Sequence, residues 1–61
     1  MNLEEIKEGM KCFDTDCPQF GQGRIMLVEP EDDLVEVVYM DIEDIVQYTM
    51  NEANTHLHLL L

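Results

Sequence analysis

Apolar and polar residues alternate in several short segments of the chain, which is the pattern of β-strands. The clearest segment is 34–40, where Val35, Val37 and Tyr39 share one face and β-branched residues are frequent. The opposite face of this strand is also mostly apolar, which indicates either burial in a small curled sheet or a surface for a partner. The same reasoning predicts four further strands, at residues 10–13, 24–28, 45–49 and 56–61.

Turn-forming residues separate these segments. Residues 17–25 combine a proline, an aromatic residue and two glycines, and they predict a tight turn that leads into the second strand. Residues 30–33 predict the turn of a hairpin, and residues 51–54 predict a helical turn before the last strand. An Asn-x-x-Glu pattern followed by Gly9 is typical of a capped helical turn near the start of the chain.

Four short motifs follow one another along the chain. They are a glycine before the first strand (9–13), a Pro-x-Phe-Gly-x-Gly turn (18–25), alternating valines (35–39) and an alanine-asparagine turn (52–57). In this order they resemble the small Tudor-like, SH3-like barrel at the C-terminus of bacterial DNA-repair helicases. The resemblance implies an adaptor that binds RNA polymerase or a helicase through an apolar strand edge. The chain departs from the family in Cys17, where a histidine is usual, and in its strong negative charge.

The expected fold class is all-β. Sixty-one residues are enough for one domain with a small core, so residues 1–61 are predicted to form a single five-stranded SH3-like or Tudor-like barrel with a short helical turn before the last strand. The residues expected to supply most of the core are Phe13, Phe20, Ile25, Leu27, Val35, Val37, Tyr39, Val46 and Leu57.

The charge balance changes the functional expectation most. The chain has fourteen acidic and three basic residues, so its formal net charge is −11. Nine of the acidic residues follow the last basic residue, Arg24. Such a surface repels nucleic acid and anionic membranes and attracts cationic partners. A solvated face would also explain the run of acids. The candidate partner-binding residues are Glu31, Asp32, Asp33, Glu36, Asp41, Glu43 and Asp44.

These features favour a non-enzymatic protein-interaction module whose acidic surface docks on a basic, nucleic-acid-handling protein. Small acidic proteins of this kind resemble phage or mobile-element inhibitors that present DNA-like charge to a host nuclease or polymerase. Catalysis is not expected, because the chain has no serine for a serine triad and is too short for a buried cleft. The apolar run 59–61 makes a homodimer a further expectation.

No cofactor or metal is expected, although the cysteines and histidines leave an alternative open. Cys12, Cys17, His56 and His58 are the conventional soft ligands of the chain, but their spacing fits a zinc site poorly. A small zinc-stabilised protein and a disulfide are therefore the alternatives to ordinary packing. The chain shows neither a targeting signal nor an apolar stretch long enough to span a bilayer, so a cytoplasmic location is expected.

Overall fold

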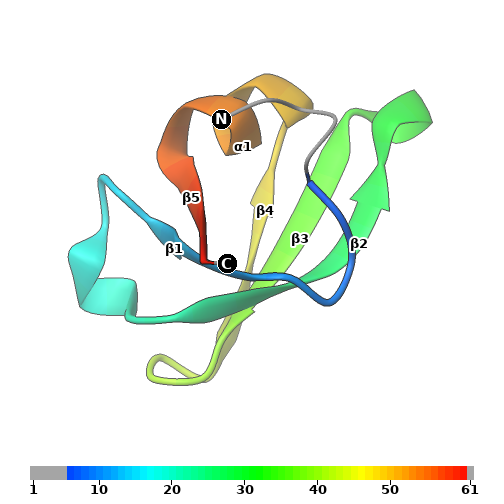
Figure 1. Cartoon of the computed structure of the whole chain (residues 1–61). Coiled ribbons are helices and arrows are strands. Elements are labelled where there is room, and N and C mark those ends of the chain that lie inside the picture. The colour runs from blue at the N-terminus through cyan, green and yellow to red at the C-terminus, as the bar shows by residue number, and fades with distance from the viewer. Residues whose placement is uncertain (1–5, 61) are drawn as a thin grey trace.

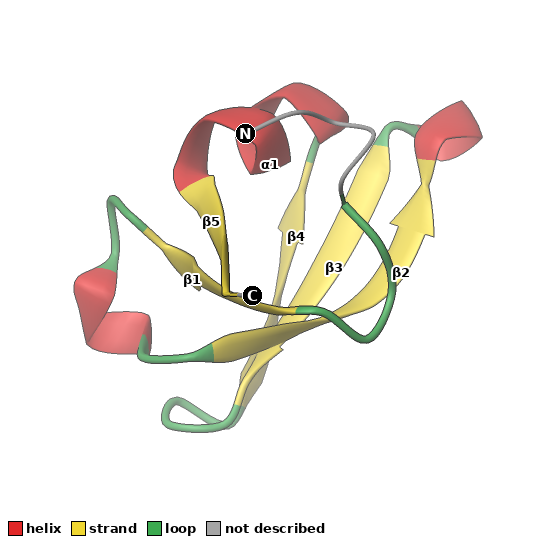
Figure 2. Cartoon of the chain, in the orientation of Figure 1, coloured by secondary structure: helices red, strands yellow, loops and turns green. Residues whose placement is uncertain are grey.

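The computed structural model describes residues 6–60, which form five antiparallel strands in one sheet and a single short α-helix before the last strand (Figures 1 and 2). Mostly β structure is therefore confirmed, and so is each predicted strand to within a few residues. The elements in chain order are β1 (Lys11–Asp14), η2 (Pro18–Phe20), β2 (Gly23–Glu29), η3 (Pro30–Asp32), β3 (Leu34–Tyr39), β4 (Asp44–Tyr48), α1 (Met50–His56) and β5 (Leu57–Leu60). The helical turn predicted near the start of the chain falls largely outside the described residues.

The sheet has the strand order β4-β3-β2-β1-β5, with every neighbouring pair antiparallel. The two outermost strands, β4 and β5, do not pair with each other, so the described sheet is not closed into a barrel. Helix α1 connects these two strands and packs against β3, β4 and β5 (Figure 1). The helix therefore covers the inner side of the curled sheet.

The inner side of the sheet carries the core. Five of the residues predicted for the core are fully or almost fully buried: Ile25, Val35, Val37, Tyr39 and Leu57. Phe20 and Val46 are partly buried and pack against this cluster, and the Phe20 ring lies 5.1 Å from the Tyr39 ring. The aromatic residue of the 17–25 turn thus attaches that turn to the core, as predicted.

A β-bulge in β2 makes the prediction for Leu27 wrong. Ile25 pairs with Val37, but the register shifts so that Leu27 pairs with Glu36 and Val28 with Val35. One extra residue reverses the alternation of side chains between the two faces. As a result Val28 packs against the core, whereas Leu27 lies on the opposite side of the sheet.

The prediction for Phe13 is also wrong, because the other face of β1 points into the core. Cys12 is fully buried, and Asp14 on the same face is only 5% exposed. Phe13 lies on the other face, where its ring is 5.1 Å from that of His58 on β5. Period-two alternation over four residues does not reveal which face is buried, and a buried aspartate is the less expected choice.

Helix α1 begins with a capping box. The Thr49 hydroxyl accepts a hydrogen bond from the Glu52 amide at 3.0 Å, and the Glu52 carboxylate accepts one from the Thr49 amide at 2.9 Å. Asp33, which follows η3 with a φ of 53°, accepts a further bond from the Met50 amide at 2.9 Å. Three amide groups near the helix start are thereby satisfied, and the β2–β3 turn is joined to α1.

Replacing Thr49 with alanine is expected to lower the free energy of unfolding by about 1 kcal/mol, because the amide of Glu52 loses its acceptor. Urea denaturation followed by circular dichroism measures the change. Thr55→Ala is the matched control, since the Thr55 hydroxyl only donates to the Asn51 carbonyl within the same helix. Equal losses in the two variants would contradict the capping role of Thr49.

Candidate functional site

The exposed acidic residues of the candidate site gather at opposite ends of β3 (Figure 1). The η3 acidic turn joins β2 to β3, and the β3–β4 acidic turn joins β3 to β4. Because β3 has six residues, the two turns are separated by about 20 Å. The η3 acidic turn consists of Glu31, Asp32 and Asp33, and the β3–β4 acidic turn consists of Asp41, Glu43 and Asp44.

Some of these carboxylates also have a structural role. Asp33 accepts a hydrogen bond from Met50, and Asp44 accepts one from the amide of Ile45 at 2.8 Å. Glu43 has a backbone φ of 53°, which residues other than glycine and asparagine rarely adopt. Acids with a structural role could not be distinguished from fully solvated acids in the sequence. The distinction depends on where the fold places the backbone amides that they bind.

Negative charge is concentrated at the η3 acidic turn. A hydrogen bond with Asp32 raises the pKa of Glu29, and desolvation and the charges of Asp32, Glu36 and Glu8 raise it further. A shallow hollow at this end of the sheet is lined by Val28, Glu29, Pro30, Glu31 and Asp32.

Between the two acidic turns lies a mostly apolar surface, the side of β2, β3 and β4 that faces away from the core. Met26 is 48% exposed and Ile45 is 47% exposed. Glu36 is the acid in the middle of this surface, and it accepts a hydrogen bond from the Gln47 amide at 2.8 Å. This surface is called the outer face below; it consists of Arg24, Met26, Leu27, Glu29, Leu34, Glu36, Val38, Ile45 and Gln47.

Of the two cations of the sheet, Arg24 on β2 pairs with Val38 on β3 and lies on the same side of the sheet, whereas Lys11 lies one strand further from β3. Lys11 on β1 and Arg24 on β2 are cross-strand partners, and both are exposed. Within residues 6–60 the one ion pair joins His56 to Asp16, at a different part of the molecule. The carboxylates of the two acidic turns therefore have no basic partner among the described residues.

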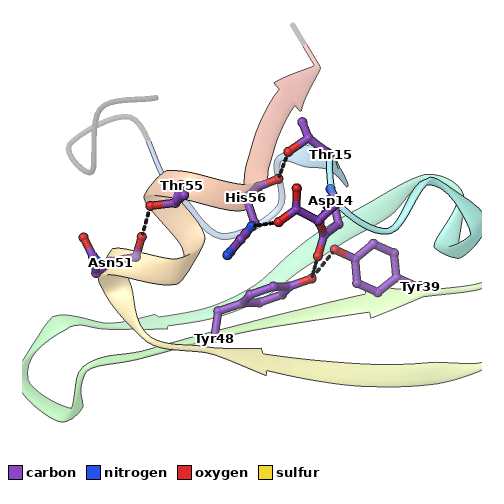
Figure 3. A network of polar contacts seen from close by, with 8 residues as sticks. Asp14, Thr15, Tyr39, Tyr48, Asn51, Thr55 and His56 are labelled. Carbon is purple, nitrogen blue, oxygen red and sulfur yellow. Dashed lines mark hydrogen bonds and ion pairs between the residues drawn. The ribbon is translucent and has the colours of Figure 1, made fainter.

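A second polar group lies inside the protein, where Asp14 meets two tyrosines (Figure 3). The Tyr48 hydroxyl donates to the Asp14 carboxylate at 2.8 Å, and the Tyr39 and Tyr48 hydroxyls are 2.7 Å apart. Because the Tyr48 hydroxyl donates its proton to Asp14, it accepts the hydrogen bond from the Tyr39 hydroxyl. The other oxygen of Asp14 accepts from the Asp16 amide at 2.8 Å. Every member of this chain of groups is satisfied, which is the condition for a stable buried network.

The turn that follows β1, at Thr15 and Asp16, contacts the end of α1 next to this network (Figure 3). Thr15 donates to the His56 carbonyl through both its amide, at 2.8 Å, and its hydroxyl, at 3.1 Å. The His56 ring pairs with the Asp16 carboxylate. The sequence contained one signal for a buried aspartate: Asp14 is two residues after Cys12, so the two side chains lie on the same face of a strand. These contacts hold β1, α1 and β5 together, and they give Asp14 and the tyrosines a structural role.

Stability is expected to fall in alkali. Burial raises the pKa of Cys12 from 9.0 to about 11 and the pKa of Tyr39 from 10.0 to about 12, and it raises that of Tyr48 as well. A folded-state pKa above the unfolded value favours the neutral form, so this stabilisation is complete below about pH 9 and is lost as the pH rises through the folded values. Thermal melts between neutral pH and pH 11 measure it. An unchanged melting temperature across that range would contradict the burial of these groups.

The cysteines and histidines of the zinc alternative are not brought together. Cys12 is buried in the core, Cys17 is half-buried, and both are free thiols. His56 ends α1 instead of lying in the last strand, so it does not share a face with His58, which is exposed on β5. Among residues 6–60, no three His, Cys, Asp or Glu side chains are grouped to hold a metal ion.

The described surface thus offers charge and apolar area for contact with another molecule. The helices of residues 6–60 are all too short and too polar to cross a membrane. No family model, curated protein or solved structure matches the chain.

Proposed function

We propose that the chain is a non-enzymatic protein-interaction module whose acidic surface docks on a basic, nucleic-acid-handling protein. The observation that supports this proposal is the position of the two acidic turns, which place uncompensated carboxylates at both ends of β3. Glu31 and Asp41 are exposed, and the one ion pair among the described residues joins His56 and Asp16 at another part of the molecule. A net charge of −11 on 61 residues also lowers stability through self-repulsion, so a function that uses the charge explains its retention.

The partner surface proposed here is one that normally binds nucleic acid. Two groups of carboxylates about 20 Å apart present negative charge on one molecule, and a surface that binds the phosphate backbone attracts such charge. An inhibitor from a phage or a mobile element that occupies the nucleic-acid channel of a host nuclease or polymerase fits this charge pattern. We further propose that the sheet is related to SH3-like and Tudor-like barrels; the strand order and the helix before the last strand support this relation.

Neutralising one acid in each turn is expected to weaken binding to the partner about tenfold at low salt, because each exposed ion pair contributes up to about 1 kcal/mol. The variant carries Asp32→Asn and Asp41→Asn. It spares Asp33 and Asp44, which hydrogen-bond to backbone amides. The partner is first identified by affinity capture from the native host lysate at low salt, and its affinity is then measured by titration calorimetry.

A second variant with the same net charge is the control. Asp16→Lys replaces one negative charge by a positive one, so both variants change the net charge from −11 to −9. Asp16 is exposed and lies near His56, away from the acidic turns. Binding weakened equally by the two variants would show that only net charge matters. Unchanged affinity in the Asp32 and Asp41 variant would contradict the proposal.

A strand edge supports a second candidate function, that of a Tudor-like adaptor for RNA polymerase or a helicase. The outer edge of β4 is unpaired in the described sheet, and its Ile45 is 47% exposed. A strand of a partner could extend the sheet there through backbone hydrogen bonds. Such a complex depends little on salt, which distinguishes it from docking through the acidic turns.

A further inference from the structure

The strand β3 is wholly apolar on its inner side and carries Leu34, Glu36 and Val38 on its outer side, and only the inner side is covered. Its inner residues Val35, Val37 and Tyr39 are fully buried beneath α1 and β5. On the outer face no helix or strand of residues 6–60 packs over the sheet, and Met26 and Ile45 remain about half exposed. An antiparallel sheet commonly has one face on the core and one face in solvent, and the apolar side chains on this outer face make it a candidate contact surface for a partner.

The size of the outer face fits one helix. Three strands about 4.8 Å apart give a width of about 10 Å, which is the diameter of an α-helix with its side chains. The length of β3, about 20 Å, corresponds to about 13 residues of helix. A folded domain would need a larger contact, since stable interfaces bury about 800 Å² on each partner.

The charges around the outer face select the kind of helix. The η3 acidic turn lies at one end of this face and the β3–β4 acidic turn at the other. Arg24 lies beside Val38 near the β3–β4 acidic turn, where the three carboxylates of that turn outnumber it. A second copy of the chain would bring its own acidic turns near these carboxylates, which is unfavourable. A helix with basic residues at both ends would instead place opposite charges together. Glu36 in the centre has one oxygen bound to Gln47 and a second oxygen that a donor on the helix can reach.

We propose that the outer face binds a single amphipathic α-helix of the partner, with an apolar stripe in its middle and lysine or arginine at both ends. This proposal rests on the proposed function, because it names the element through which the acidic module holds its basic partner. The apolar stripe covers Met26, Leu27, Val38 and Ile45, and the terminal cations reach the two acidic turns.

The test uses a synthetic helical peptide of about 13 residues, a length that matches β3. The peptide carries leucines at i, i+3, i+4 and i+7 spacing and lysines at both ends, and a scrambled peptide of the same composition is compared with it. Titration calorimetry gives the affinity, and amide chemical shifts locate the contact. The expected result is that the amphipathic peptide shifts Leu27, Val38 and Ile45, while the scrambled peptide binds more weakly.

Two sets of variants separate apolar contact from charge. Met26→Gln with Ile45→Thr is expected to weaken the peptide about tenfold, because two half-exposed apolar side chains lose their contact. Leu60→Thr is the matched control, because Leu60 is 38% exposed on β5, the other edge strand, and should leave the affinity unchanged. None of the three positions belongs to the buried core, so the variants are expected to fold.

Each outcome decides between the two proposals. Loss of peptide binding in the Asp32 and Asp41 variant but not in the Met26 and Ile45 variant would overturn the helix-binding face while leaving the acidic module intact. Equal binding of the scrambled peptide would do the same. Self-association through Ile45 in sedimentation experiments, without peptide binding, would assign the face to a second copy instead. Loss of binding in both variants, with Leu60→Thr unaffected, is the result that supports the proposal.

Discussion

Replacing Asp14 with alanine is expected to lower the free energy of unfolding by about 3 kcal/mol, the largest effect of any single polar substitution in the described chain. Asp14 is 5% exposed and accepts hydrogen bonds from the Tyr48 hydroxyl and the Asp16 amide. The substitution leaves the Tyr48 hydroxyl buried without its acceptor. A chain of 61 residues buries little surface and has little stability to lose, so a large fraction of the variant should be unfolded at 37 °C.

Denaturation with urea, followed by tyrosine fluorescence and circular dichroism, measures this loss. Asp14→Asn should retain more than half of the stability, because the Tyr48 hydroxyl can reverse and accept from the asparagine amide. Asp16→Ala is the control, since that carboxylate is exposed and its pair with His56 contributes less than about 1 kcal/mol. If Asp14→Ala were as stable as Asp16→Ala, the buried network would not contribute to the fold.

Replacing Gly23 with alanine is expected to cost about 3 kcal/mol, because the added methyl group would enter a filled part of the core. A Cβ atom at this position would lie 2.6 Å from Cγ1 of Val37 and 2.7 Å from Cε1 of Tyr39. Both neighbours are fully buried, and they have no space to move into. Gly23 is therefore required by close packing and not by an unusual backbone angle.

The cost at Gly23 can be separated from a general effect on the turn. Shortening Val37 to alanine removes one of the two clashes, so the double variant with Gly23→Ala should be less destabilised than the sum of the single variants. Gln22→Ala, at the exposed neighbouring position, is expected to change stability by less than about 0.5 kcal/mol. Strict additivity in the double variant would contradict a steric cause.

Much of the fold could be predicted because its strands show clear alternation. In β3, Val35, Val37 and Tyr39 occupy one face without interruption, and the structure buries all three. The bulge in β2 could not be predicted, because the residues around Met26 show no sequence signal for a bulge. Without the bulge, the predicted alternation placed Leu27 on the core face, which is the wrong face. Closure of the sheet likewise depends on pairing between β4 and β5, which no local pattern encodes.

The candidate site was predictable in composition but not in arrangement. Counting residues gives the excess of acids, and the turn positions of Glu31 and Asp41 follow from their neighbours. The arrangement of these acids could not be predicted. They form two turns at the two ends of one face of the sheet, and this depends on the register of β2, β3 and β4. The structural role of Asp33 was missed because its partner, Met50, is 17 residues away in the sequence.

The most direct measurement for an acidic module that docks on a nucleic-acid-handling protein is competition between this protein and duplex DNA for the captured partner, at a series of salt concentrations. The expected result is that the protein displaces the DNA at low salt, that both affinities fall with salt, and that the Asp32 and Asp41 variant displaces DNA about tenfold less well. A partner that binds DNA and this protein simultaneously, with an affinity independent of salt, would contradict the proposed function.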